Sequence, residues 1–231
     1  MTRKSLFHFA LVGLLWGIPY LLMKVAVEDF PPAAVVAGRT LIGASILIPI
    51  AIYRKKFGGA VLGVKYVAFY ALMEMIGPWI LITTAEQKIN SGLAGLLVST
   101  VPIFATIITS LRGDHSVWQF KRIFGIVVGF IGLILVVGIE SLSGNSDPLS
   151  IAMVILASMG YSYAVIMVTS NLPLVDGIAI NGLAMAITSV FWAPVAIAQW
   201  PSSISLNSTL SLLALGVFST AFAFILFFKV M

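Results

Sequence analysis

Eight apolar runs, most of them long enough to cross a lipid bilayer, occupy nearly the whole sequence. A spanning helix needs about 20 mostly apolar residues to match the hydrocarbon layer. Within lipid, a lone apolar segment can satisfy its backbone hydrogen bonds only as a helix. The sequence therefore predicts an all-α, polytopic membrane helix bundle with eight spans: Leu6–Ala26, Ala33–Tyr53, Tyr66–Ala85, Leu93–Leu111, Phe124–Ile139, Leu149–Thr169, Ile178–Gln199 and Leu210–Phe228.

Composition excludes a soluble domain. Hydrophobic residues make up 60% of the chain and charged residues 9%, whereas a soluble domain carries about 25% charged residues. The absence of cysteine excludes disulfides and thiolate metal sites. The net charge of +5 comes mainly from loops between apolar runs, so it indicates membrane orientation and not nucleic-acid binding. The lipid bilayer is the expected surrounding partner.

The distribution of basic residues predicts the orientation of the chain. Ten of the 13 Lys and Arg residues fall at the N-terminus, at the C-terminus and in the loops around Lys55 and Lys121. The opposite loops hold only Lys88 among basic residues, together with acidic residues such as Glu28 and Asp147. Because basic loops stay in the cytoplasm, we expect a multi-pass protein of the inner or plasma membrane with a cytoplasmic N-terminus.

A weak internal repeat relates the two parts of the chain. An offset of 143 residues places Gly17 on Gly160 and Tyr20 on Tyr163, and maps the first three spans onto the last three. A unit of five spans is odd, so its second copy would enter the membrane from the opposite face. This predicts a first five-span half at 1–140 and an incomplete second half at 141–231. The intramembrane charges have no counterparts in the second half, which places the expected chemistry in the first.

Four segments carry a resemblance to a known family. They are LLWGIPYLLMKVAV (14–27), PPAAVVAGRTLIGA (31–44), SGLAGLLVSTVPIFATIIT (91–109) and GIVVGFIGLILVVG (125–138). In this order and spacing, the chain resembles the EamA-type members of the drug/metabolite transporter superfamily. A fifth segment, LALGVFSTAFAFILFFKVM (213–231), resembles the eighth span of that family.

The resemblance implies ten spans in two inverted five-span halves around a central cavity. It also implies transport of small organic solutes such as amino acids, metabolites or drugs. The sequence departs from the family by stopping after the eighth span, so we expect the last two spans to be missing. It departs again at LRGDHSVWQ (111–119): the family commonly has a Gly-Glu pair there, and the resemblance implies that Asp114 stands in for it.

Glu74 is the acidic residue placed deepest within a span. Pro78 follows four residues later and has no N–H, so the carbonyl of residue 74 loses its helical partner. An acid inside the membrane is costly and often marks a transport path. One hypothesis is a carboxylate that binds a proton or a cation. The alternative is a protonated side chain that satisfies a neighbour by hydrogen bonding.

Lys24 and Arg39 lie inside spans, toward the predicted outer face. They could bind or steer an anionic group of a substrate. The alternative is that their long side chains reach the membrane surface, with Glu28 or Glu86 as counter-ion. For Lys24 we favour the alternative, whereas for the deeper Arg39 the two hypotheses stay close.

Aromatic residues and glycine near the middle of the spans are candidates for lining a cavity, although aromatic side chains in spans more often pack against other helices. These candidates are Trp16, Gly17, Tyr20, Trp79 and Tyr163. Prolines inside spans free carbonyls and kink helices. Pro19, Pro78 and Pro102 are therefore the expected hinges.

The favoured function is a secondary transporter of small organic molecules that works by alternating access. An intramembrane enzyme acting on lipid would need paired acids, a His cluster or a Ser/Lys set, and the sequence contains none at helical spacing. A non-transporting membrane subunit is a further alternative. No enzymatic activity, cofactor or metal is expected; a small-molecule substrate is, and association with further copies of the chain stays open.

The orientation can be tested with single cysteines, because the chain has none of its own. Substituting Lys55→Cys or Asp147→Cys should give proteins that react differently with an impermeant maleimide in intact cells. We expect labelling at position 147, which faces outward, and protection at position 55. Labelling at 55 with protection at 147 would reverse the topology.

Overall fold

The computed structural model describes residues 3–137 and 147–230, and that part of the chain contains helices and no strand. Six helical stretches in it are long and apolar enough to cross a membrane. They are α3 (Pro32–Tyr53), Val64–Ala85, Ser91–Leu111, α11 (Pro148–Asn171), α12 (Gly177–Ala198) and Leu206–Phe228. The prediction of an all-helical integral membrane protein is confirmed at this level.

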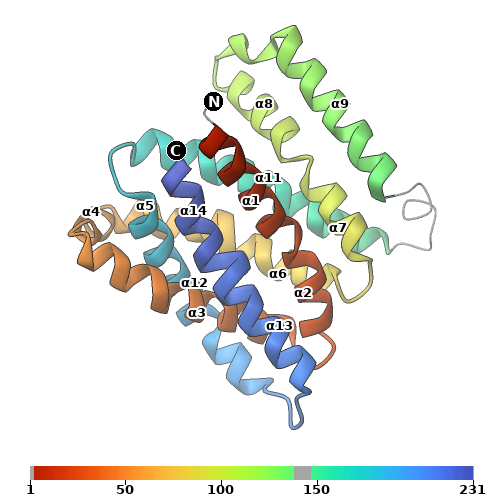
Figure 1. The fold of residues 1–231 in the computed structure, drawn as a ribbon, viewed down its shortest axis with the longest axis vertical. Helices are drawn as coiled ribbons and strands as arrows, with labels where there is room; N and C mark the ends of the chain where they lie inside the picture. The colour runs from red at the N-terminus through yellow and green to blue at the C-terminus, as the bar shows by residue number, and fades with distance from the viewer. Residues whose placement is uncertain (1–2, 138–146, 231) are drawn as a thin grey trace.

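The first and fifth predicted spans also fall on helices. The first consists of α1 (Arg3–Gly17) and α2 (Pro19–Ala26), and the fifth is α9 (Phe120–Val137). Helix α9 lies at the edge of the bundle (Figure 1) and exposes large apolar side chains such as Phe120 and Leu135. The predicted boundary at 140/141 lies outside the described residues. The count of eight spans therefore stays a prediction.

Three long stretches are interrupted, two by a π-helix and one by a turn. Val64–Ala85 comprises α5 (Val64–Ala71), the π-helix η1 (Leu72–Ile76) and α6 (Gly77–Ala85). Leu206–Phe228 is covered by α13 (Leu206–Gly216), the π-helix η3 (Val217–Phe222) and α14 (Ala223–Val230). Ser91–Leu111 comprises α7 (Ser91–Val98) and α8 (Val101–Leu111). Two short helices, α4 (Phe57–Leu62) and the 3₁₀-helix η2 (His115–Trp118), lie in connections.

The three expected hinge prolines all lie in the first turn of a helix that follows a break. Pro19 opens α2, Pro78 lies in the first turn of α6 and Pro102 in the first turn of α8. A proline fits there because its missing N–H would have no intrahelical acceptor anyway. Before Pro78 the chain widens into η1, where the Gly77 N–H bonds to the Leu72 carbonyl five residues back. The backbone near Glu74 is thus π-helical, and not an α-helix with one carbonyl left free.

The bundle is organised around α3 and α12, which make the most extensive contact between two helices. Helix α11 packs along α5, η1 and α6, while α1 and α2 pack along α14 and α13 (Figure 1). Glycine permits the central contact, because a Cβ on Gly182 of α12 would lie 3.2 Å from the Leu47 Cβ of α3. Small residues allow helices to approach closely where lipid supplies no hydrophobic drive.

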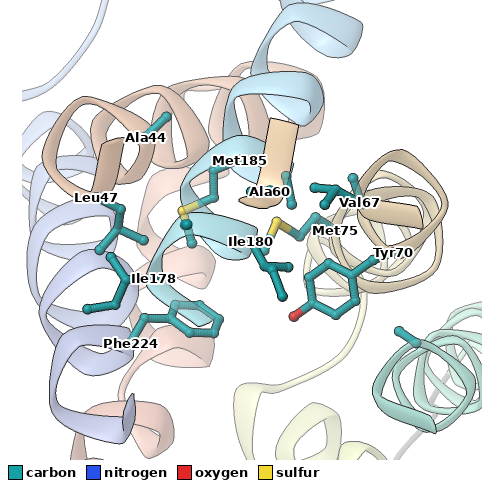
Figure 2. Packing of buried hydrophobic residues seen from close by; sticks show 14 of the residues in the cluster. Ala44, Leu47, Ala60, Val67, Tyr70, Met75, Ile178, Ile180, Met185 and Phe224 are labelled. Carbon is teal, nitrogen blue, oxygen red and sulfur yellow. The ribbon is translucent and has the colours of Figure 1, made fainter. Parts of the chain in front are cut away.

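Aliphatic side chains fill the space between the central pair and the third span. Leu47, Met75 and Met185 are fully buried there and belong to α3, η1 and α12. Figure 2 shows Tyr70 at the border of this cluster, with its hydroxyl pointing away from Met75 and Val67. The cluster therefore fixes η1 against α12, whereas the Tyr70 hydroxyl points out of the cluster.

Candidate functional site

A cavity of about 790 Å³ lies between the helices of the bundle. Its deep part is lined by Tyr20, Arg39 and Trp79, and it extends to Leu172 and Val175 in the connection between α11 and α12. That connection lies at the end of the bundle where α1 begins and α14 ends (Figure 1). The cavity thus extends from the middle of the bundle to one of its ends.

Five of the eight predicted binding residues line this cavity, together with the hinge residue Pro19. They come from α1, α2, α3, η1 and α6, and are Trp16, Tyr20, Arg39, Glu74 and Trp79. The structure thus brings together side chains that are up to 63 positions apart in the sequence. Trp16 contacts Phe224 and Phe227 of α14 at ring-centroid distances of 5.9 and 5.0 Å, which makes one wall aromatic.

Arg39 is 6% exposed and is the single cationic side chain among the described residues that line the cavity. Its guanidinium carbon lies 3.7 Å from the centre of the Trp79 ring, a cation–π contact. Its Nε and Nη2 donate to Thr220 Oγ1 at 3.3 and 3.0 Å, and its Nη1 donates to Met23 Sδ at 3.6 Å. In the described part of the chain no carboxylate forms an ion pair with Arg39.

Glu74 enters the cavity from η1 and is half-buried. Its Oε2 is buried and has no hydrogen-bond partner within the described residues. Tyr70, also lining the cavity, donates to Asn181 Oδ1 at 3.1 Å. Tyr161 of α11 lines the same cavity. The carboxyl group of Glu74 and the guanidinium of Arg39 therefore face the same cavity, and neither is neutralised by a charged protein partner that the structure describes.

The other predicted site residues lie elsewhere. Lys24 Nζ donates to the backbone carbonyls of Glu86 and Ile89 at 2.5 and 3.0 Å, so it caps the C-terminal end of α6. Tyr163 is 41% exposed and packs edge-to-face against Phe69. Gly17 lies at the break between α1 and α2, outside the cavity lining.

Hydrogen bonds between helices close the end of the bundle opposite the cavity opening. Ser91 Oγ donates to the Tyr20 carbonyl at 3.2 Å, which ties α7 to α2. Asp29 accepts bonds from the Ser205 N–H and hydroxyl at 2.9 and 2.5 Å. Ser208 Oγ of α13 donates to the Val25 carbonyl at 3.1 Å. Together with the Lys24 contacts, these bonds hold α2 against both α7 and α13.

Several polar groups of the cavity were not predicted from sequence, and they come largely from the second part of the chain. Asn181 and Ser219 line the cavity, and Thr220 binds Arg39. They are uncharged, and the sequence analysis looked for ionisable residues inside apolar runs, so it did not find them. The adjacent Ser219 and Thr220 within an otherwise apolar span could have pointed to these groups. The π-helical turn that contains them gives them their place at the cavity and at Arg39.

Comparison with known proteins identifies a family and several relatives. The model of the EamA-like transporter family matches residues 3–138. The uncharacterized transporter YoaV of Bacillus subtilis (strain 168) is 28% identical over 229 residues, which cover 95% of this chain and 77% of YoaV. Protein PagO of Salmonella typhimurium (strain LT2) is 31% identical over 126 residues, covering 54% of this chain and 41% of PagO.

The fold also matches a solved structure. One crystal structure superposes with a TM-score of 0.72 at 17% sequence identity, and the match covers 98% of this chain and 79% of that protein. At this level of identity the likeness concerns the fold alone. The prediction that the family's last two spans are missing from this chain stays a prediction.

Glu86, which follows directly after the third spanning stretch, supplies a prediction on stability. Its side chain is fully buried and its Oε1 has no partner among the described residues, while Oε2 lies 3.2 Å from the Ser91 hydroxyl, whose one hydrogen it shares with the Tyr20 carbonyl. Burial raises the pKa of Glu86 from 4.5 to about 8, and the Ser91 hydroxyl and the Lys24 charge partly oppose this rise. Folding thus favours the protonated carboxyl. This stabilising contribution is complete below pH 4.5 and is lost as the pH rises through about 8.

We therefore expect Glu86→Gln to flatten the decline of Tm between pH 6 and pH 9 that the wild-type protein shows in detergent. The amide stays neutral across this range, so no charge has to be buried at high pH. Glu28→Gln is the matched control, since it removes an exposed carboxyl two residues past α2 and should keep the wild-type decline. Equal slopes for wild type and Glu86→Gln would show that the buried carboxyl does not titrate in this window.

Proposed function

The chain belongs to the EamA-like transporter family, and from this premise we propose that it carries small organic solutes across the cell membrane by alternating access. The observation that carries the proposal is the cavity that contains Arg39 and Glu74. Its volume of about 790 Å³ lies within the range of about 300–1,000 Å³ that small-molecule sites occupy. Its walls are mostly apolar, with a few convergent polar groups near the middle of the bundle.

An intramembrane enzyme acting on lipid is the competing function. Hydrolysis or group transfer would require a nucleophile beside a base, or two acids at a shared position. Glu74 is the single carboxylate among the described residues that line the cavity, and no His lies beside Ser219 in that lining. The cavity therefore favours binding over catalysis.

We further propose eight spans related by an inverted repeat, with α1/α2 and α9 as the first and fifth. The predicted offset of 143 residues superposes Glu74 of η1 on Val217 of η3. Each part of the chain thus has a π-helical segment at nearly the same repeat position. The helix contacts agree with this relation, because α3 pairs with its counterpart α12, and α11 packs on the third span as α1 and α2 pack on the last.

If the basic loops are cytoplasmic, as we propose, the described conformation opens toward the cytoplasm. Leu172 and Val175 at the mouth of the cavity then lie on the cytoplasmic side. The hydrogen bonds that Lys24 donates and that Asp29 accepts lie on the outer side and close it. Transport would require this closed end to open while the other end closes.

Two glycines at equivalent repeat positions differ in their packing. A Cβ on Gly160 of α11 would lie 2.7 Å from the Met73 carbonyl oxygen and 3.0 Å from Pro78 Cγ. At Gly17, by contrast, a Cβ would meet nothing within 4 Å. Helix α11 is continuous, whereas the first span breaks between Gly17 and Pro19. We propose that α1 pivots at this break and packs Gly17 against η3 in the alternate state, while the Gly160 contact opens.

This exchange predicts opposite effects for two alanine substitutions. Gly160→Ala should disfavour the described conformation, because its methyl group would clash with the backbone at Met73. Gly17→Ala should leave that conformation intact and disfavour the alternate one. With Val168→Cys as a reporter in the cavity wall, maleimide labelling from the cytoplasmic side should fall several-fold in Gly160→Ala and rise in Gly17→Ala.

Gly129→Ala on α9 serves as the control, since a Cβ there also meets nothing within 4 Å and the residue has no proposed role in gating. Its labelling should equal that of the parent protein. A change in the same direction for Gly160→Ala and Gly17→Ala would contradict the proposed exchange.

Glu74 provides the test of ion coupling. Glu74→Gln keeps the shape and hydrogen-bonding capacity of the side chain but removes its ability to bind and release a proton. We expect this variant to insert normally and to lose proton-linked solute movement in membrane vesicles, followed with a pH-sensitive dye during addition of amino acids and small amines. Glu74→Asp should retain part of the activity.

Lys65→Gln, at the cytoplasmic start of the same stretch and outside the cavity lining, is the matched control for a charge change. Full transport with unchanged pH dependence in Glu74→Gln would reduce Glu74 to a structural hydrogen-bonding group.

A further inference from the structure

Of two neighbouring hydroxyl residues of η3, one lines the cavity and the other contacts Arg39. Ser219 lines it, is 2% exposed, and its Oγ has no hydrogen-bond partner among the described residues. Thr220 is fully buried and contacts the guanidinium of Arg39. A buried hydroxyl without a partner costs free energy, so its occurrence beside a cavity points to a ligand that supplies the missing bond.

The π-helical turn gives Thr220 an unusual orientation. Its hydroxyl donates to the Leu215 carbonyl, five residues back, at 2.8 Å. Buried threonines in the α-helices, such as Thr40 and Thr188, donate four residues back instead. Because the Thr220 hydrogen is used on Leu215, its oxygen can only accept from Arg39, at 3.3 Å from Nε and 3.0 Å from Nη2. Thr220 therefore fixes the direction of the guanidinium.

The guanidinium retains unused donors. Its five N–H groups lie in one plane. The N–H of Nε and one N–H of Nη2 donate to Thr220, and one N–H of Nη1 donates to Met23. The second N–H of each terminal nitrogen has no acceptor among the described residues. Trp79 covers one face of the plane at 3.7 Å. One free donor on each terminal nitrogen suits a carboxylate, which binds arginine through both oxygens.

We propose that Arg39 and Ser219 form a subsite that binds the carboxylate group of the transported solute, with Thr220 and Trp79 as positioning residues. This inference rests on the proposed transport function and names the chemical class of its substrate. Arg39 is the one cation among the described lining residues, which matches a singly charged carboxylate better than a doubly charged phosphate. Apart from Glu74, Tyr70 and Asn181 the remaining lining is largely apolar, so the solute is expected to carry a mainly apolar side group.

The experiment compares acids with their uncharged amides. The full chain, reconstituted in liposomes, is offered phenylalanine, leucine and hexanoate, each beside the corresponding carboxamide, with phenyl phosphate as a competitor. Wild-type protein should transport at least one acid in preference to its amide. Thr220→Val should reduce this preference about 10-fold, which corresponds to losing one hydrogen bond to a charged group, and Thr220→Ser should retain it. Ser219→Ala should weaken binding of the acids and leave that of the amides unchanged.

Thr188→Val is the matched control, since it removes a buried threonine hydroxyl that bonds only to the Ala184 carbonyl. It should keep the acid preference, whereas a general packing defect would affect it like Thr220→Val. Equal transport of acids and amides by the wild-type protein would overturn the subsite and leave the transport function in place. Stronger competition by phenyl phosphate than by the acids would overturn the assignment to carboxylate. Absence of transport for every solute would count against both the subsite and the proposed function.

Discussion

A positive charge buried in the middle of an apolar bundle is the constraint on which much of this structure depends. Removing an arginine side chain from water costs several kcal/mol unless other groups replace its hydration. Here the ring of Trp79, the hydroxyl of Thr220 and the sulfur of Met23 take that role. These groups come from α6, η3 and α2, so the guanidinium of Arg39 on α3 fixes four elements relative to one another. None of its partners neutralises the charge, which leaves the cavity ready for an anion.

Departures from regular α-helix place the polar groups of the cavity. An unbroken apolar helix offers its neighbours only side chains, because its backbone groups bond to one another. The π segments η1 and η3 rotate the following residues and bring Glu74, Ser219 and Thr220 to the cavity or to Arg39. They also expose backbone, as when the indole of Trp192 donates to the Ile76 carbonyl at 3.1 Å. Such π-bulges are often found at functional positions.

The sequence predicted the features that follow from the length of hydrophobic runs and from the free-energy cost of burying a charge in them. The spanning helices follow from run length, and Arg39 and Glu74 were found because ionisable groups are rare within such runs. For Lys24 the favoured hypothesis was a side chain at the membrane surface with Glu28 or Glu86 as counter-ion; its ammonium binds the carbonyls of Glu86 and Ile89 and also acts on the Glu86 carboxyl. That contact depends on how α6 ends beside α2. The roles of Ser219 and Thr220 depend on a π-helical turn, and the periodicity of an apolar run does not reveal one.

The charges of the cavity also connect binding to movement. In the alternating access that we propose, closure of the cavity would expel water and strengthen the interaction between charges, because the local dielectric would fall. With no solute present, closure would leave Arg39 without a counter-ion and the Glu74 oxygen without a donor among the described residues. A solute that brings a negative charge to Arg39 and a proton or a cation to Glu74 removes both penalties. A loaded cavity should therefore close more readily than an empty one, and this difference is what a coupled transporter requires.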